Sequence, residues 1–312
     1  MTKSVKPETP SATLPAPTRC GFIAVIGPTN AGKSTLVNAL VGAKVTIVSH
    51  KVQTTRTQIR GIAMEGVSQL VFIDTPGIFQ PRRRLDRAMV DAAWGSASDV
   101  DIVALLIDAQ RGLNDDLERI IERLGDRPVV VILNKVDKVE DKEELLKLAA
   151  ILAKKLTIER LFMISALSGS GIAVVKSYFA GRVPLGPWHY PEDDISDAPL
   201  RMLASEITRE RIYHWLHQEL PYETTVETTA WVEKADGSVR IEQTIYVMRD
   251  SQKSIVLGKG GEMIKKLSTQ ARKELTDICE KPVHLFLFVK VREAWESDPE
   301  RYREMGLDYP KE

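Results

Sequence analysis

The chain has 312 residues, of which 43% are hydrophobic and 28% charged, a composition that excludes a largely disordered protein and allows about two domains. Lys+Arg and Asp+Glu are equal at 43 each, so the net charge decides nothing about a polyanionic partner. The two cysteines lie far apart, which excludes a disulfide framework, and no apolar run approaches the roughly 20 residues that span a bilayer. We therefore expect a soluble protein.

The N-terminal half alternates apolar runs with helical stretches. Residues 1–18 are polar and rich in proline, and we expect them to form a disordered tail. From Phe22 onward the apolar runs are FIAVIG, QLVFIDT, DIVALLIDA, PVVVILNK and RLFMISA, with helices between them. Such alternation is typical of an α/β fold with a mostly parallel sheet covered on both faces. We assign residues 19–182 to this domain.

The C-terminal half has a different pattern. The stretch GRVPLGPWHYPEDDISDAP is rich in proline and acidic residues, which predicts a surface linker over residues 183–199. After it, the sequence predicts an α+β domain over residues 200–300 with the order α-β-β-α-α-β, including an Asp-Gly hairpin turn at Asp236. We set residues 301–312 apart as a C-terminal tail.

The stretch GPTNAGKS follows the first predicted strand and opens a helix, which is the context that a GxxxxGK[ST] loop requires. Its backbone N–H groups can wrap phosphates, Lys33 can neutralise the β- and γ-phosphate oxygens, and Ser34 can ligate Mg²⁺. Taken alone, the pattern could also be a structural turn. We predict nucleotide contacts from Gly27, Asn30, Ala31, Gly32, Lys33, Ser34 and Thr35.

Three further motifs, DTPG, NKVD and SAL, follow three other predicted strands. In DTPG, Asp74 can reach the Mg²⁺ shell and the Gly77 N–H can contact a γ-phosphate. In NKVD, the carboxylate of Asp137 can accept the N1–H and the exocyclic amine of guanine, which adenine does not offer. Because all the motifs stand at strand ends where α/β sheets bind ligands, together they predict a guanine-nucleotide site. Its further contacts are Asp74, Gly77, Asn134, Lys135, Asp137, Ser165, Ala166 and Leu167.

The segment KVQTTRTQ lies between the first two motifs, where a mobile segment can place a threonine on Mg²⁺ only when the γ-phosphate is present. We favour Thr55, and the alternative is a threonine-rich edge strand. The predicted metal ligands are thus Ser34, Thr55 and Asp74, and the predicted catalytic residues are Lys33, Thr55 and Gly77. Ile78 follows DTPG where a glutamine could orient water, so intrinsic hydrolysis should be slow.

A second glycine-rich loop, GKGG, stands between two predicted helices near the end of the chain. A GxxG loop between helices is typical of domains that clamp about four single-stranded nucleotides, although a plain turn is an equal alternative for the motif alone. Between Arg249 and Lys273 there are seven Lys or Arg and two acidic residues, which favours phosphate binding. The predicted RNA contacts are Gly258, Lys259, Gly260, Gly261, Lys265 and Lys266.

The motifs GPTNAGKSTLVNAL, QTTR, FIDTPGI, NKVD and SAL, followed by HQELPYE and IVLGKGGEMIK, resemble those of the Era family of bacterial GTPases over nearly the whole chain. The resemblance implies a P-loop GTPase domain followed by a type II KH domain that binds the 3′ end of 16S rRNA. It also implies a role in 30S subunit maturation, a cytoplasmic location with peripheral association with the inner membrane, and K⁺ beside Mg²⁺ at the position of Asn30. We further expect a monomer.

Two other classes of function stay open at this point. A metabolic P-loop enzyme such as a kinase would have no use for NKVD, and a preference for ATP would favour it. An RNA-binding scaffold with a vestigial, nucleotide-independent GTPase domain would show no GTP turnover. The intact Lys33, Ser34 and Asp74 argue against the scaffold.

Overall fold

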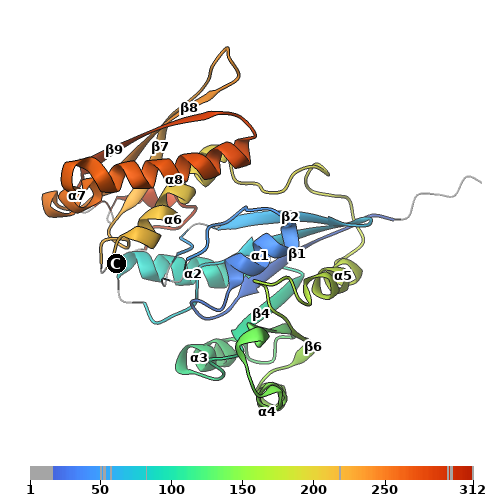
Figure 1. Cartoon of the computed structure of the whole chain (residues 1–312). Coiled ribbons are helices and arrows are strands. Elements are labelled where there is room, and N and C mark those ends of the chain that lie inside the picture. The colour runs from blue at the N-terminus through green and yellow to red at the C-terminus, as the bar shows by residue number, and fades with distance from the viewer. Residues whose placement is uncertain are drawn as a thin grey trace, which may run out of the picture.

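The computed structural model describes residues 17–310 except residues 50, 52, 53, 57, 82, 218, 294, 296 and 297. The predicted disordered tail therefore lies almost entirely outside the described residues. The described chain forms two sheets, one of six strands and one of three, which correspond to the two halves of the sequence (Figure 1).

The N-terminal half is built on a six-stranded sheet with the strand order β2-β3-β1-β4-β5-β6. All neighbouring pairs are parallel except β2 and β3, which are antiparallel. The strands are β1 (Arg19–Ile26), β2 (Ile59–Glu65), β3 (Ser68–Asp74), β4 (Ile102–Asp108), β5 (Val129–Asn134) and β6 (Ile158–Met163). The five predicted strands are present, whereas β2 was not expected, because IRGIAME has an inner glycine and no clear alternation.

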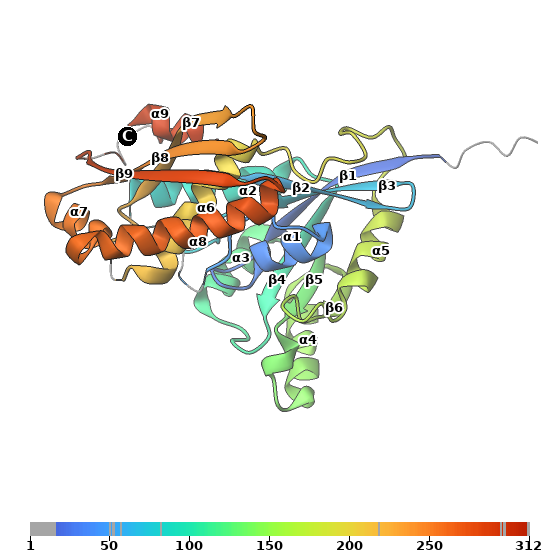
Figure 2. The same cartoon turned by 45° about the horizontal axis from the view of Figure 1, so that its top comes forward.

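Helices cover both faces of this sheet. One core cluster joins the sheet to α1 and α5, and a second joins its other face to α2, α3 and α4 (Figure 2). The side chains of Asn114 and Asp141 accept backbone N–H groups at the starts of α3 and α4. The helices are α1 (Lys33–Val41), α2 (Arg84–Ser98), α3 (Asp115–Leu124), α4 (Lys142–Lys155) and α5 (Ile172–Arg182), with a 3₁₀ turn η1 (Val136–Lys138).

The C-terminal half has the predicted α-β-β-α-α-β order. β7 and β8 are antiparallel, and β8 and β9 are parallel. The elements are α6 (Leu200–Trp215), β7 (Thr225–Glu233), β8 (Val239–Val247), α7 (Asp250–Leu257), η2 (Lys259–Gly261), α8 (Glu262–Cys279), β9 (Val283–Val291) and α9 (Pro299–Glu304). The predicted fold class, a mostly parallel α/β domain followed by an α+β domain of this order, is confirmed.

The connecting segments pack on the N-terminal half. Residues 183–199 form isolated bridges through Leu185 to Arg19 and through Ser196 to Gly61. The end of the chain from Trp295 on, which includes the predicted tail of residues 301–312, contacts α2 where it is described. Its buried residues Trp295, Tyr302, Met305 and Leu307 cluster with Leu85, Ala88 and Met89.

Candidate functional site

The first glycine loop connects β1 to α1, as the sequence predicted. Lys33 is only 6% exposed, and its Nζ donates to the carbonyl oxygens of Gly27 at 3.1 Å and Pro28 at 2.9 Å. Burial lowers the pKa of Lys33 to about 8, and the charge of Asp74 opposes the shift. An anion bound in the loop would therefore favour the protonated form of this lysine.

Three predicted metal ligands converge beside the loop. The Ser34 hydroxyl lies 2.8 Å from Asp74 Oδ2 and 2.9 Å from Thr55 Oγ1, and Thr55 Oγ1 lies 3.5 Å from the same carboxylate oxygen. Thr46 also donates to Asp74 Oδ2, at 2.8 Å, a contact that no sequence motif indicated. Two hydroxyls and a carboxylate form the kind of oxygen donor set that Mg²⁺ prefers.

One carboxylate oxygen of Asp74 is buried without a hydrogen-bond partner. The residue is fully buried, burial raises the pKa of its carboxyl, and the oxygen without a partner is Oδ1. A buried carboxylate oxygen without a partner is costly, and a cation beside it would remove that cost. The residues present therefore fit Mg²⁺ at this corner.

Gly77 closes the loop from the opposite side. A Cβ at this position would lie 2.6 Å from Thr29 Cγ2 and 2.9 Å from Thr29 Cα, so only glycine allows the close approach. The next residue, Ile78, is 5% exposed, belongs to the core, and donates its N–H to Gly27 O at 3.1 Å. Because the Ile78 side chain packs into the core and is apolar, it cannot orient the water that attacks the γ-phosphate.

The NKVD motif holds the other end of the site together. Asn134 donates to Ala31 O at 2.8 Å and accepts from the Ala166 N–H at 2.9 Å, which ties the glycine loop to SAL. Lys135 donates to Asn30 O at 2.6 Å and to Asp108 Oδ2 at 2.7 Å. These bonds hold the backbone of the first glycine loop in place through the carbonyls of Asn30 and Ala31.

The carboxylate of Asp137 is exposed beyond these bonds. A hydrogen bond from the Ser165 side chain holds the pKa of Asp137 below its ordinary value, so the group stays ionised and able to accept two N–H groups. This is the acceptor arrangement that guanine requires.

A cavity of about 380 Å³ unites the motifs. Twelve predicted residues line it: Asn30, Gly32, Lys33, Ser34, Thr35, Thr55, Gly77, Asn134, Lys135, Asp137, Ser165 and Leu167. The four others, Gly27, Ala31, Asp74 and Ala166, bond to lining residues. Lining residues that sequence reasoning missed include Lys51, Asp108, Arg111 and Lys138, and only their positions next to the motifs could have indicated them.

The segment between the first two motifs is docked on the C-terminal half. Lys44 Nζ donates to Glu210 Oε2 at 2.6 Å, and the Val48 N–H donates to Glu210 Oε1 at 2.7 Å. Lys51 Nζ donates to the carbonyls of Tyr213 and Leu216 at the end of α6. The segment that supplies Thr55 is thus held by α6.

The second glycine loop is exposed. Lys259, Gly260, Lys265 and Lys266 are exposed, and Lys266 also places its Nζ 3.2 Å from the centre of the Trp215 ring. Gly258 has a φ of 73°, and a Cβ there would lie 2.8 Å from the Met263 nitrogen, so the start of the loop requires glycine. The loop joins α7 to α8, as predicted.

The described residues offer neither a second metal centre nor a membrane span. No group of three or more His, Cys, Asp or Glu side chains in them could hold a metal ion. No helix among them is long and apolar enough to cross a membrane.

Comparisons with known families match both halves. Residues 22–135 match the family described as 50S ribosome-binding GTPase, and residues 219–296 match the KH domain. The chain is 64% identical over 303 residues to GTPase Era of Sinorhizobium medicae (strain WSM419), covering 96% of this chain and 97% of that protein. It is 66% identical over 297 residues to GTPase Era of Rhizobium meliloti (strain 1021), covering 95% of each.

Solved structures resemble the whole chain as well. A crystal structure of Era in complex with MgGDPNP and nucleotides 1506–1542 of 16S ribosomal RNA has a TM-score of 0.87 at 34% identity, covering 93% of this chain and 99% of that one. A structure of a variant of Aquifex aeolicus Era bound to GDP.AlF4⁻ has a TM-score of 0.87 at 35% identity and the same coverage.

Proposed function

The chain belongs to the Era family of GTPases, and from that premise we propose that it binds the 3′ region of 16S rRNA through its KH domain and acts in 30S subunit assembly. Its enzymatic activity is the hydrolysis of GTP to GDP and phosphate. We propose further that the nucleotide state controls the grip on RNA. The relative bound to MgGDPNP and 16S rRNA nucleotides 1506–1542 supports the choice of RNA.

The proposed roles follow the geometry of the site. Lys33 binds the β- and γ-phosphates, Gly77 donates its N–H to the γ-phosphate, and Asp137 accepts from guanine. Ser34, Thr55 and Asp74 would hold Mg²⁺, which supplies positive charge to the phosphate oxygens when bound. Since Ile78 is part of the core, turnover without a stimulating partner should be slow.

The proposed regulation rests on one observation: the segment around Thr55 contacts both the nucleotide site and α6. Thr55 lies 2.9 Å from Ser34 in the nucleotide site, while the neighbouring Thr54 carbonyl accepts from Arg209 of α6 at 2.5 Å. A γ-phosphate that moves Thr55 must therefore strain or remake contacts with α6. By linkage, RNA binding would then change the affinity for GTP by the same factor.

The test is the affinity for a single-stranded RNA with the sequence of the 16S 3′ end, measured with a non-hydrolysable GTP analogue, with GDP and without nucleotide. We expect the tightest binding with the analogue and a loss of about tenfold or more on Lys259→Glu. Lys234→Glu, an exposed lysine in the β7–β8 hairpin away from the loop, is the charge-matched control. Equal RNA affinities in all three nucleotide states would contradict the proposal that the bound nucleotide regulates RNA binding.

Three finer proposals rest on the family alone. We propose a K⁺ ion near Asn30, which lines the nucleotide cavity, and replacing KCl by NaCl should then slow hydrolysis. We also propose a monomer in the cytoplasm with peripheral association with the inner membrane. Size-exclusion chromatography and sedimentation with anionic vesicles test these two proposals.

A further inference from the structure

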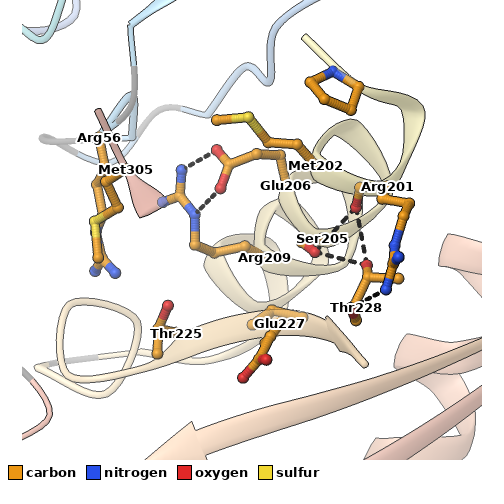
Figure 3. Close-up of a pocket in the computed structure, with 12 residues that line it drawn as sticks. Arg56, Arg201, Met202, Ser205, Glu206, Arg209, Thr225, Glu227, Thr228 and Met305 are labelled. Atoms are coloured by element: carbon orange, nitrogen blue, oxygen red, sulfur yellow. Dashed lines mark hydrogen bonds and ion pairs between the residues drawn. The ribbon is translucent and has the colours of Figure 1, made fainter. Parts of the chain in front are cut away.

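A second cavity of about 380 Å³ lies between the two halves of the chain (Figure 3). Its lining comes from Arg56 of the docked segment, from α6, from β7, and from Met305 near the end of the chain. None of its lining residues belongs to the nucleotide site or to the GKGG loop. The proposed function uses Arg209 for its contact with Thr54 but gives the cavity itself no ligand.

Arg209 has a buried hydrogen-bond donor without a partner. The residue is 2% exposed, its Nε donates to Glu206 at 2.8 Å, and its Nη2 donates to Glu206 and Thr54. Nη1 is buried and has no hydrogen-bond partner. Figure 3 shows this third nitrogen on the side of the guanidinium opposite Glu206, toward Met305. An unpaired charged donor in the interior is costly.

Arg56 adds a second buried positive charge at the same end. It is 4% exposed, and its guanidinium donates to the carbonyls of Thr224 at 2.9 Å, Tyr222 at 2.8 Å and Pro221 at 3.2 Å and to the Tyr213 hydroxyl at 3.2 Å, so its bonds are to neutral groups. In the part of the chain that the structure describes, no carboxylate forms an ion pair with it. Burial lowers the pKa of its guanidinium. Two buried arginines thus lie beside Glu206, which pairs with Arg209, and Glu227 of β7 is the second carboxylate in the cavity lining.

Away from the two arginines, the cavity lining is first apolar and then polar at its exposed end. Met202 and Val226 supply apolar walls. At the mouth, the Arg201 guanidinium donates to Thr228 O at 3.1 Å, and the Ser205 hydroxyl lies 2.7 Å from Thr228 Oγ1. A ligand that fits this lining has an anionic group at one end, an apolar middle and a polar outer end.

We propose that this cavity binds phosphate or a small phosphate monoester, with the phosphate group facing Arg56 and Arg209. Guanidinium groups match phosphate oxygens in geometry and charge. The phosphate would give Nη1 of Arg209 a partner and would compensate the charge of Arg56. In an ester, the organic part would lie against Met202 and Val226.

The ligand would stabilise the contact between the docked segment and α6, since Arg56 belongs to the first and Arg209 to the second. It would thereby favour the present arrangement of the two halves. The cavity residues neither hold the nucleotide nor form the GKGG loop, but the proposed control by nucleotide passes through the contact of Arg209 with Thr54. Ligand binding is therefore measured in both nucleotide states, so that a failure of that control does not count as a failure of the cavity.

The experiment is calorimetric titration of the full chain, saturated with Mg²⁺ and, in separate runs, with GDP or with a non-hydrolysable GTP analogue, so that the first glycine loop is filled in both states. The probes are inorganic phosphate and AMP, whose base lacks the groups that Asp137 accepts. We expect saturable binding of one ligand per chain, weakened about tenfold for both probes by Arg209→Gln and severalfold for AMP alone by Arg201→Ala. Phosphate alone binding would identify the inorganic anion, and tighter binding of AMP would identify an ester, and both support the proposal.

Arg240→Ala is the matched control, because this side chain is 47% exposed, pairs with Glu242 and lies outside the cavity lining. If Arg209→Gln does not fold, Met202→Trp should block the cavity by filling it. The proposal would be overturned if neither probe bound saturably in either nucleotide state, if Arg240→Ala caused an equal loss, or if binding were undiminished in Met202→Trp.

Discussion

The two glycine loops of this chain differ in how firmly the rest of the fold holds them. The first is tied from behind by Asn134 and Lys135, and a Cβ at Gly27 would overlap the Leu106 carbonyl oxygen. In the second, a Cβ at Gly260 or Gly261 would meet nothing within 4 Å. The first loop lines the nucleotide cavity, and the second projects from the ends of α7 and α8 into solvent.

This difference suits two kinds of phosphate ligand. A loop fixed by hydrogen bonds before binding loses little freedom when it takes up one nucleotide of fixed shape. An open loop leaves a polynucleotide free to enter and leave along its length, and binding there depends mainly on charge. If the two loops are independent in this sense, a substitution in one of them leaves the ligand affinity of the other unchanged.

The largest effect is expected from Lys33→Ala. The substitution removes the buried cation that faces the phosphates, so GDP affinity should fall about a thousandfold, or ~4 kcal/mol. Lys138→Ala, which alters an exposed lysine of the same cavity, should change the affinity less than threefold. Nucleotide-free RNA affinity should not change in either variant, and a parallel loss in Lys33→Ala would show that the loops are not independent.

The pH dependence of GDP binding should follow the same lysine. In the free protein the pKa of Lys33 is lowered to about 8, and bound phosphate favours its protonated form. Above pH 8 binding must therefore take up a proton, and GDP affinity should fall about tenfold per pH unit. Fluorescence titrations from pH 7 to pH 9.5 check this, and an unchanged dissociation constant across the range would contradict it.

Gly258→Ala and Gly260→Ala form a matched pair in the second loop. Both residues have positive φ, but a Cβ at 258 also meets the Met263 backbone, while position 260 is open. We expect a roughly tenfold loss of RNA affinity for Gly258→Ala, and a smaller loss for Gly260→Ala that reflects only about 1 kcal/mol of backbone strain. Equal losses would mean that the packing against Met263 does not shape the loop. GDP affinity serves as the internal reference.

How much of this the sequence predicted depends on the range of the interactions. GPTNAGKS and GKGG are local patterns, so the loops and the helices after them were predicted at the right places. Thr46 and Asp108 take part in the nucleotide site through contacts with residues distant in sequence, and no motif marks them. The pairing of Arg56 with the end of α6 depends on how the two halves pack, which no spacing within either half encodes.

The smallest effects should distinguish two adjacent lysines that the sequence predicted as equivalent RNA contacts. Lys265 and Lys266 are both exposed, but only Lys266 lies over the Trp215 ring, with its Nζ 3.2 Å from the ring centre. Trp215 Nε1 in turn donates to Gln270 at 2.6 Å. Lys265→Ala should lower RNA affinity about two- to threefold and reduce the salt dependence by about one phosphate contact. Lys266→Ala should instead lower the free energy of unfolding by about 0.5–1 kcal/mol through loss of the cation–π contact.

Salt titrations of RNA binding and denaturant unfolding of both variants separate these outcomes. If Lys266→Ala reduced the salt dependence and left stability unchanged, its contact with Trp215 would be broken when RNA binds. The RNA-binding surface would then include Lys266 of α8 as well as Lys265. Because GDP binds in the enclosed loop at the other end of the docked segment, neither substitution should change GDP affinity.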